Sequence, residues 1–214
     1  MSTFKIEDAT LVIVGAWNVA IIEPQWIVKN ALQVPSGTKS PIEMEVSMGL
    51  ATNFRSKIND LYFIPSNDKF IINPSKENEE LFKLADFAAI NLYRTLSHTP
   101  IQAIGYNFTY VLDADENYTI DIANCAGTNN SEFYKRINAI ARPETNIQHS
   151  LLLGADDAAV LNVQYNITSS NKFLKMNYHY QVNKDAKKIE KALGKFNNNY
   201  QHATLVNSAL TKKG

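Results

Sequence analysis

The chain has 214 residues, of which 45% are apolar and 20% are charged, and its net charge is zero. This composition excludes an intrinsically disordered polypeptide. The single cysteine, Cys125, excludes an internal disulfide framework and a zinc site built on cysteines. The sequence shows no secretory signal and no apolar run that could span a bilayer, so we expect a cytoplasmic protein with no membrane partner.

Residues 1–74 are expected to form a β-rich lobe with one short helix. Residues 4–14 are rich in strand-forming residues, and Pro24 suits the first position of a helix that reaches Leu32. Clean alternation predicts a half-buried strand over residues 42–48. Two short apolar runs, 61–64 and 70–72, flank a turn at 65–68 and therefore predict a hairpin.

Residues 75–214 are expected to form a helix, a four-stranded antiparallel sheet and a C-terminal helix. Apolar spacing predicts the first helix over residues 75–97, with Ser75 as its N-cap and Pro100 beyond its end. Alternation then predicts a strand over residues 103–112, and an irregular stretch follows with a short helix at 131–141.

Three further strands are predicted at 147–153, 160–167 and 173–182, and their short connections indicate an antiparallel meander. One continuous helix is expected over residues 184–209. The fold class is therefore α+β, with the helices packed on one face of the sheet, and the two parts of the chain could form one continuous domain.

The first candidate surface is the polar face of this predicted sheet. On the last two strands, alternation places amide and imidazole side chains opposite the apolar ones, at Asn162, Gln164, Asn166, Asn177 and His179. Asn107 and Thr109 extend the same face. Such a face could bind another protein, or a second copy of the chain, through hydrogen bonds at low desolvation cost. The structural alternative is the solvated side of an antiparallel sheet.

The second candidate surface is basic and would bind an anionic partner such as nucleic acid. Residues 172–214 contain nine lysines against Asp185 and Glu190, a net charge of +7. Within a continuous helix, i, i+4, i+7 and i+11 spacing would place four of them on one side: Lys184, Lys188, Lys191 and Lys195. A solvated helix face would explain the same residues.

The third hypothesis is a metal-dependent hydrolase built on aspartates, namely Asp113, Asp115, Asp156 and Asp157. The stretch 113–117 begins like a calcium loop, but Tyr118 stands where that loop requires glycine. Aspartates are also common in turns because their side chains form hydrogen bonds with the nearby backbone, so we predict no metal ligands.

Sequence motifs for catalysis are missing from the chain. No serine lies in a Gly-x-Ser-x-Gly elbow, and no glycine-rich phosphate loop occurs among the eight glycines. We therefore predict no catalytic residues and no cofactor, and we favour a binding protein over an enzyme.

Two segments resemble a known family. Residues 96–108, LSHTPIQAIGYNF, and the ending from residue 173 through Phe196 to Tyr200 are similar to a sporadically distributed family of uncharacterised bacterial proteins. The acidic residues usual in that family after the last strand are missing here. The resemblance implies an accessory protein of mobile-element or defence islands and implies no activity. Taken together, the sequence predicts a non-catalytic protein-interaction module of a bacterial or phage multiprotein system.

Overall fold

The computed structural model describes residues 3–4, 9–47, 53–112, 117–118, 145–153, 159–167 and 172–212. Its main element is a ten-stranded sheet made of β1 (Thr3–Phe4), β2 (Thr10–Gly15), β3 (Ile42–Ser47), β4 (Asn53–Ile58), β5 (Leu61–Pro65), β6 (Lys69–Pro74), β7 (Ile101–Leu112), β9 (Thr145–Leu153), β10 (Ala159–Ile167) and β11 (Lys172–Gln181). The order is β3-β4-β5-β6-β2-β7-β11-β10-β9, β1 pairs with β7, and every pairing is antiparallel. β8 (Asn117–Tyr118) and β12 (Thr211–Lys212) form a separate two-stranded sheet.

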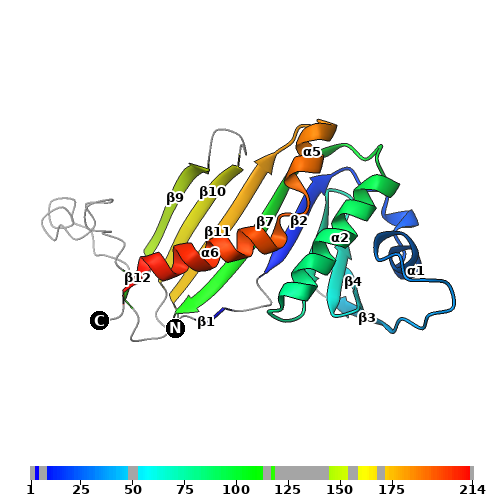
Figure 1. The fold of residues 1–214 in the computed structure, drawn as a ribbon, viewed down its shortest axis with the longest axis horizontal. Helices are drawn as coiled ribbons and strands as arrows, with labels where there is room; N and C mark the ends of the chain where they lie inside the picture. The colour runs from blue at the N-terminus through cyan, green and yellow to red at the C-terminus, as the bar shows by residue number, and fades with distance from the viewer. Residues whose placement is uncertain are drawn as a thin grey trace, which may run out of the picture.

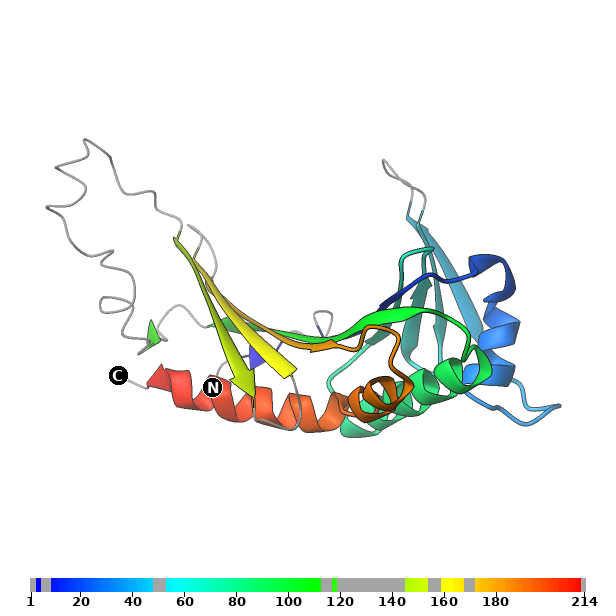
Figure 2. The same cartoon turned by 90° about the horizontal axis from the view of Figure 1, so that it is seen from above.

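The helices lie on one face of the large sheet (Figure 1). They are η2 (Val19–Ile21), α1 (Pro24–Trp26), which continues into η3 (Ile27–Ala31), α2 (Glu79–Thr95), α5 (Ala186–Ala192) and α6 (Phe196–Leu210). The predicted α+β fold with helices on one face is therefore confirmed. Among the described residues, no helix covers the other face, which we call the open face. The two ends of the sheet bend away from the helices, so the open face is concave (Figure 2).

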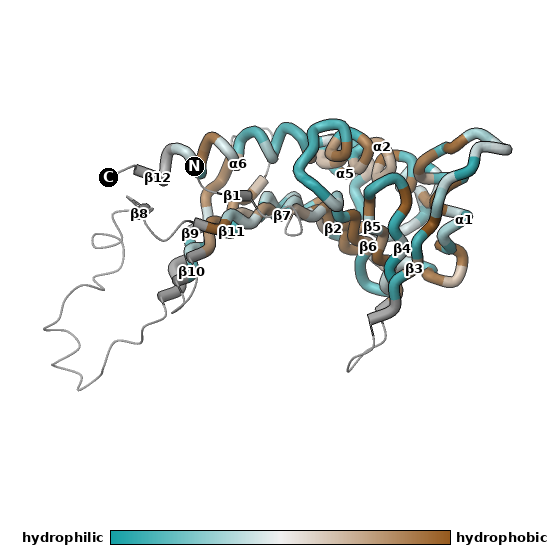
Figure 3. The backbone as a smooth tube through the Cα atoms, turned by 90° about the horizontal axis from the view of Figure 1, so that it is seen from below, coloured by the Kyte–Doolittle hydropathy of each residue, from teal (hydrophilic) through white to brown (hydrophobic). Residues whose placement is uncertain are grey.

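The strands form where the sequence alternates between polar and apolar residues, and this alternation is visible along the tube in Figure 3. The helix-side residues of β7 and β11 are buried aromatic and aliphatic side chains, including Tyr106, Phe108 and Tyr178. Strands and helices from both sides of residue 74 contribute to one buried cluster, because β2 and β6 pair within the same sheet as β7.

Two predicted details of the helices are wrong. The first helix begins at Glu79, and its N-cap is Asn78, whose side chain accepts from the N–H groups of Glu80 and Leu81. Ser75, the predicted cap, still follows β6 directly, and its N–H donates to the carbonyl of Asp60.

The predicted continuous helix over residues 184–209 is broken into α5 and α6. Gly194 between them has a φ of +77°, a left-handed conformation that ends helices and favours glycine. α6 then starts anew at Phe196, whose N–H lies 3.0 Å from both carboxylate oxygens of Asp86 on α2. Asp86 therefore caps α6 from another helix.

Tyr106 of β7 also holds this junction between α5 and α6. Its hydroxyl donates to the carbonyl of Ala192 at 2.9 Å and accepts from the N–H of Lys195 at 3.2 Å. Burial raises the pKa of Asp86 to about 7, against the opposing effect of its backbone hydrogen bonds. Burial also raises the pKa of Tyr106 well above its ordinary value.

Candidate functional site

Alternation along β10 and β11 places the five predicted partner-binding residues on the open face. Their neighbours in sequence, such as Leu161, Val163 and Tyr178, are buried on the helix side. Asn162, Gln164, Asn166, Asn177 and His179 are each only half-exposed. The structure thus places these residues together on the concave side of the sheet.

A chain of hydrogen bonds crosses five neighbouring strands of this face. Asn107 on β7 donates to the Thr10 hydroxyl on β2 at 3.0 Å, and Asn177 on β11 donates to the Asn107 amide oxygen at 2.7 Å. Asn162 on β10 donates to the Asn177 amide oxygen at 3.2 Å, and the Ser150 hydroxyl on β9 donates to Asn162 at 2.6 Å. We call these five residues the amide ladder.

Strand register produces the amide ladder. Each of its members is directly opposite the next in the antiparallel pairing, Thr10 to Asn107, Asn107 to Asn177, Asn177 to Asn162 and Asn162 to Ser150. Side chains directly opposite in a sheet have Cβ atoms about 5 Å apart, which is within reach of one amide-to-amide hydrogen bond. The ladder therefore fixes the orientation of three half-buried amide groups.

The amide ladder uses only half of the hydrogen-bonding capacity of its asparagines. An asparagine side chain has two N–H donors and two lone pairs on oxygen. In the ladder, Asn107, Asn177 and Asn162 each give one N–H and accept one hydrogen bond. Each amide thus keeps one N–H and one lone pair that the ladder does not use.

Beside the amide ladder lies an open hollow of about 290 Å³. Its polar lining comes from four strands and consists of Asn107, Thr109, Gln148, Asn162, Gln164, Lys175 and Asn177. The charged member of this lining is Lys175, which is exposed and lies opposite both Thr109 and Gln164 in the pairing. The hollow therefore presents amide and hydroxyl groups around one ammonium group.

Gly105 allows the ladder to pack closely on β7. A Cβ atom at this position would lie 3.2 Å from the Asn177 amide nitrogen, closer than an ordinary van der Waals contact. Gly105 is opposite His179, whose ring nitrogen Nε2 is 3.1 Å from the Gln181 amide oxygen. Asn166 lies farther along β10, opposite Asn146 and Phe173.

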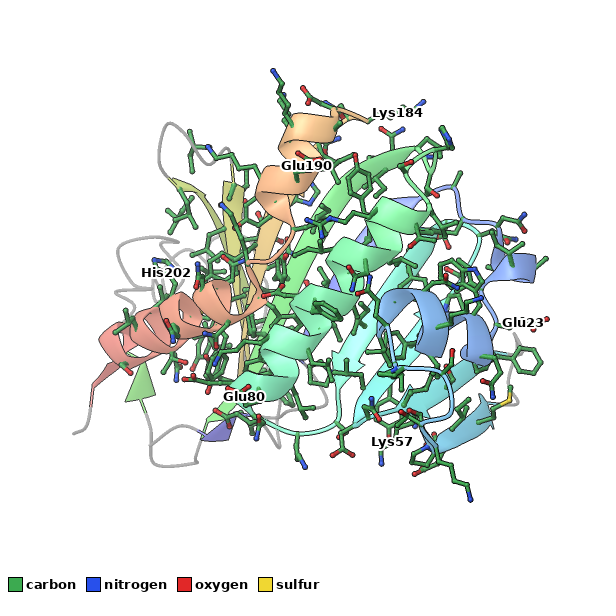
Figure 4. The ribbon with its side chains drawn as sticks, turned by 45° about the vertical axis from the view of Figure 1, so that its right-hand side comes forward. Glu23, Lys57, Glu80, Lys184, Glu190 and His202 are labelled. Atoms are coloured by element: carbon green, nitrogen blue, oxygen red, sulfur yellow. The ribbon has the colours of Figure 1, made fainter. Side chains whose placement is uncertain are left out.

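The four lysines that were expected to share one side of a continuous helix do not lie on one helix. Lys188 and Lys191 belong to α5, Lys184 precedes it with a φ of +64°, and Lys195 follows the break at Gly194. Lys195 is half-buried, and its ammonium lies 5.2 Å from the centre of the Tyr180 ring. The remaining lysines are exposed around α5 with Glu190 beside them, and Figure 4 shows Lys184 and Glu190 at that end of the molecule.

The aspartates of the metal hypothesis, Asp113, Asp115, Asp156 and Asp157, lie outside the described residues, as do Cys125 and the predicted helix at 131–141. Within the part of the chain that the structure describes, no three His, Cys, Asp or Glu side chains are grouped to hold a metal ion. In the same part, no helix has the length and apolarity to cross a bilayer.

A second, larger hollow of about 1050 Å³ lies where residues 19–27 meet β3 to β6. Its lining is mainly apolar and includes the exposed side chains of Met44 and Phe54. Arg55 and Glu45 form an ion pair among its lining residues, with Arg55 Nε 2.7 Å from a Glu45 carboxylate oxygen.

Neither a protein-family model nor a curated protein matches the chain.

Proposed function

We propose that the protein is a non-catalytic interaction module that binds another protein on the open face of its sheet. The observation that supports this proposal is the amide ladder, whose three asparagines are fixed in orientation and each keep an unused donor and acceptor. Groups that are already ordered lose little conformational entropy on binding. A partner can therefore form hydrogen bonds to them at low cost.

The charge around the amide ladder favours a protein partner over nucleic acid. β7, β9 and β10 contain no charged residue, and β11 contains only Lys172 and Lys175. Binding to a phosphate backbone requires several lysines or arginines. A peptide group of a protein, in contrast, has both an N–H donor and a C=O acceptor, so it can form hydrogen bonds with the donor and the acceptor of an amide side chain.

The shape of the open face favours a convex element of the partner, such as a helix or a hairpin. Because both ends of the sheet bend toward the same side, such an element would contact β7, β10 and β11 at once (Figure 2). The resemblance to accessory proteins of mobile-element or defence islands supports a bacterial or phage multiprotein system as the setting.

The test is affinity capture from the native cells after nuclease digestion, with quantitative mass spectrometry of the retained proteins. The open-face variant replaces Gln164 and His179 by lysine, which places two charges next to the amide ladder. Its matched control replaces Gln201 and His98 by lysine, since Gln201 is exposed on α6, His98 is exposed in the turn after α2, and neither residue belongs to the sheet. Thermal unfolding of both variants verifies that they fold.

The proposal predicts a protein that the wild type and the control retain and that the open-face variant loses at least tenfold. Equal retention by the open-face variant would refute the assignment of the surface. The nucleic-acid alternative predicts a different pattern, in which retained material disappears on nuclease digestion and depends on Lys184, Lys188 and Lys191.

A further inference from the structure

The two edges of the large sheet differ in how they are protected against pairing with another strand. One edge is β3 and the other is β9, which pairs with β10 and with no other described strand. β3 contains Glu43 and Glu45, and charged side chains are a common protection of edge strands. Both glutamates also pair across the strand, with Lys57 and Arg55.

β9 has none of these protective features. Its sequence, TNIQHSLLL, contains no charged residue, no proline and no glycine. Its pairing with β10 runs through nine consecutive residues without a bulge. A long, regular and uncharged edge strand offers its outer N–H and C=O groups to a further strand.

Leucine side chains are exposed on both faces of this edge. Leu151 is 50% exposed on the helix side, and Leu152 is 74% exposed on the open face. A single added strand would cover both of them, because adjacent residues of a strand point to opposite faces. This arrangement suits pairing at the edge better than docking on either face.

We propose that two copies of the chain associate through β9, as antiparallel neighbours in one continuous sheet. A two-fold axis at His149 pairs all nine residues, with Thr145 opposite Leu153, Ile147 opposite Leu151 and Gln148 opposite Ser150 of the second copy. In this register, helix-side residues meet helix-side residues, so both helical layers stay on the same side of the sheet. No Asp, Glu, Lys or Arg side chains meet, because β9 has none.

We favour a second copy as the partner of β9 because its own β9 has the same length and the same alternation. A two-fold axis between the two strands also gives a closed assembly. The two-fold axis pairs the outer edges of both β9 strands with each other, so assembly ends at the dimer. The pairing also joins the two open faces, since Ser150, the last member of the amide ladder, comes to lie beside Gln148 in the hollow of the second copy.

The test is sedimentation velocity of the purified full chain over a range of concentrations. A nine-residue strand pair is a small interface, so we expect a dissociation constant on the order of 10 µM and a species of twice the 24.0 kDa chain mass. Leu152→Lys gives β9 a charged side chain, the kind of protection that the glutamates give β3, and is expected to weaken the dimer at least tenfold. The control is Leu205→Lys on α6, where the leucine is 68% exposed, and it is expected to dimerise like the wild type.

A wild type that is monomeric at every concentration would overturn the proposal, and so would a Leu152→Lys variant that dimerises unchanged. Hydrogen exchange of the wild type gives a second readout that needs no variant. Amide protection of residues 145–153 is expected to increase with protein concentration, and protection that is independent of concentration would also overturn the proposal.

Discussion

The buried carboxyl group of Asp86 predicts a specific loss of stability as the pH rises. Asp86 is only 8% exposed, and burial raises its pKa from the ordinary 3.8 to about 7. Between these two values, the folded protein holds a proton that the unfolded chain releases. The free energy of unfolding therefore decreases as the pH rises through this range, and this loss levels off once the pH is above the folded pKa of about 7.

The size of this effect follows from the two pKa values. One pKa unit corresponds to about 1.4 kcal/mol, so the difference between 3.8 and about 7 amounts to about 4 kcal/mol. Roughly 2 to 3 kcal/mol of this falls between pH 5 and pH 8. Tyr106, the neighbouring group at the α5–α6 junction, remains protonated throughout, because its ordinary pKa of 10.0 already lies above this range and burial raises it further.

The assay is urea unfolding of the wild type and of Asp86→Asn at several pH values from 5 to 8, followed by tryptophan fluorescence. Asparagine keeps an oxygen that accepts from the Phe196 N–H but cannot titrate. The wild type is therefore expected to lose roughly 2 to 3 kcal/mol more than the variant over this range. Parallel curves, or a wild type that gains stability relative to the variant, would refute this account of the junction.

Three further substitutions test the junction and the amide ladder. Tyr106→Phe leaves the buried Ala192 carbonyl and the part-buried Lys195 N–H without their hydroxyl partner and should lower the free energy of unfolding by about 1–3 kcal/mol, whereas an unchanged urea midpoint would contradict that role. Gly194→Ala imposes a side chain at a φ of +77°, with its Cβ 3.3 Å from Ile90, and should cost about 1 kcal/mol or more; an equally stable variant would show that the turn relaxes freely. Gly105→Ala should displace the Asn177 amide and reduce partner capture at a stability cost of about 1 kcal/mol, and undiminished capture would speak against the ladder as the binding surface.

The strands β7, β10 and β11 are predictable from the sequence because each alternates over nine or more residues. The predicted strands at 160–167 and 173–182 match β10 and β11, and their helix-side residues are buried as expected. β4 was not predicted, because its sequence, NFRSKI, has few apolar residues. Its pairing with β3 is instead accompanied by the ion pairs of Arg55 and Lys57.

The amide ladder could be predicted only in part. Alternation gives the face on which Asn107, Asn162 and Asn177 lie, but it does not give their register, which depends on the pairing of strands distant in sequence. Alternation therefore does not identify Thr10 and Ser150 as members of the amide ladder. The break between α5 and α6 had a local signal in Gly194, but the apolar spacing on both sides of it favoured one helix.

The central claim, that the open face binds the partner, is tested most directly by comparing histidines on opposite faces of the molecule. His179 lies on the open face, His98 follows α2, and His202 lies on α6, where its Nδ1 atom is 2.7 Å from the Tyr178 hydroxyl. Diethylpyrocarbonate labelling of the captured complex and of the free protein, read by mass spectrometry, compares their accessibility. Our account predicts that the partner suppresses labelling of His179 and leaves His98 and His202 unchanged, whereas unchanged His179 with suppressed His98 or His202 would contradict it.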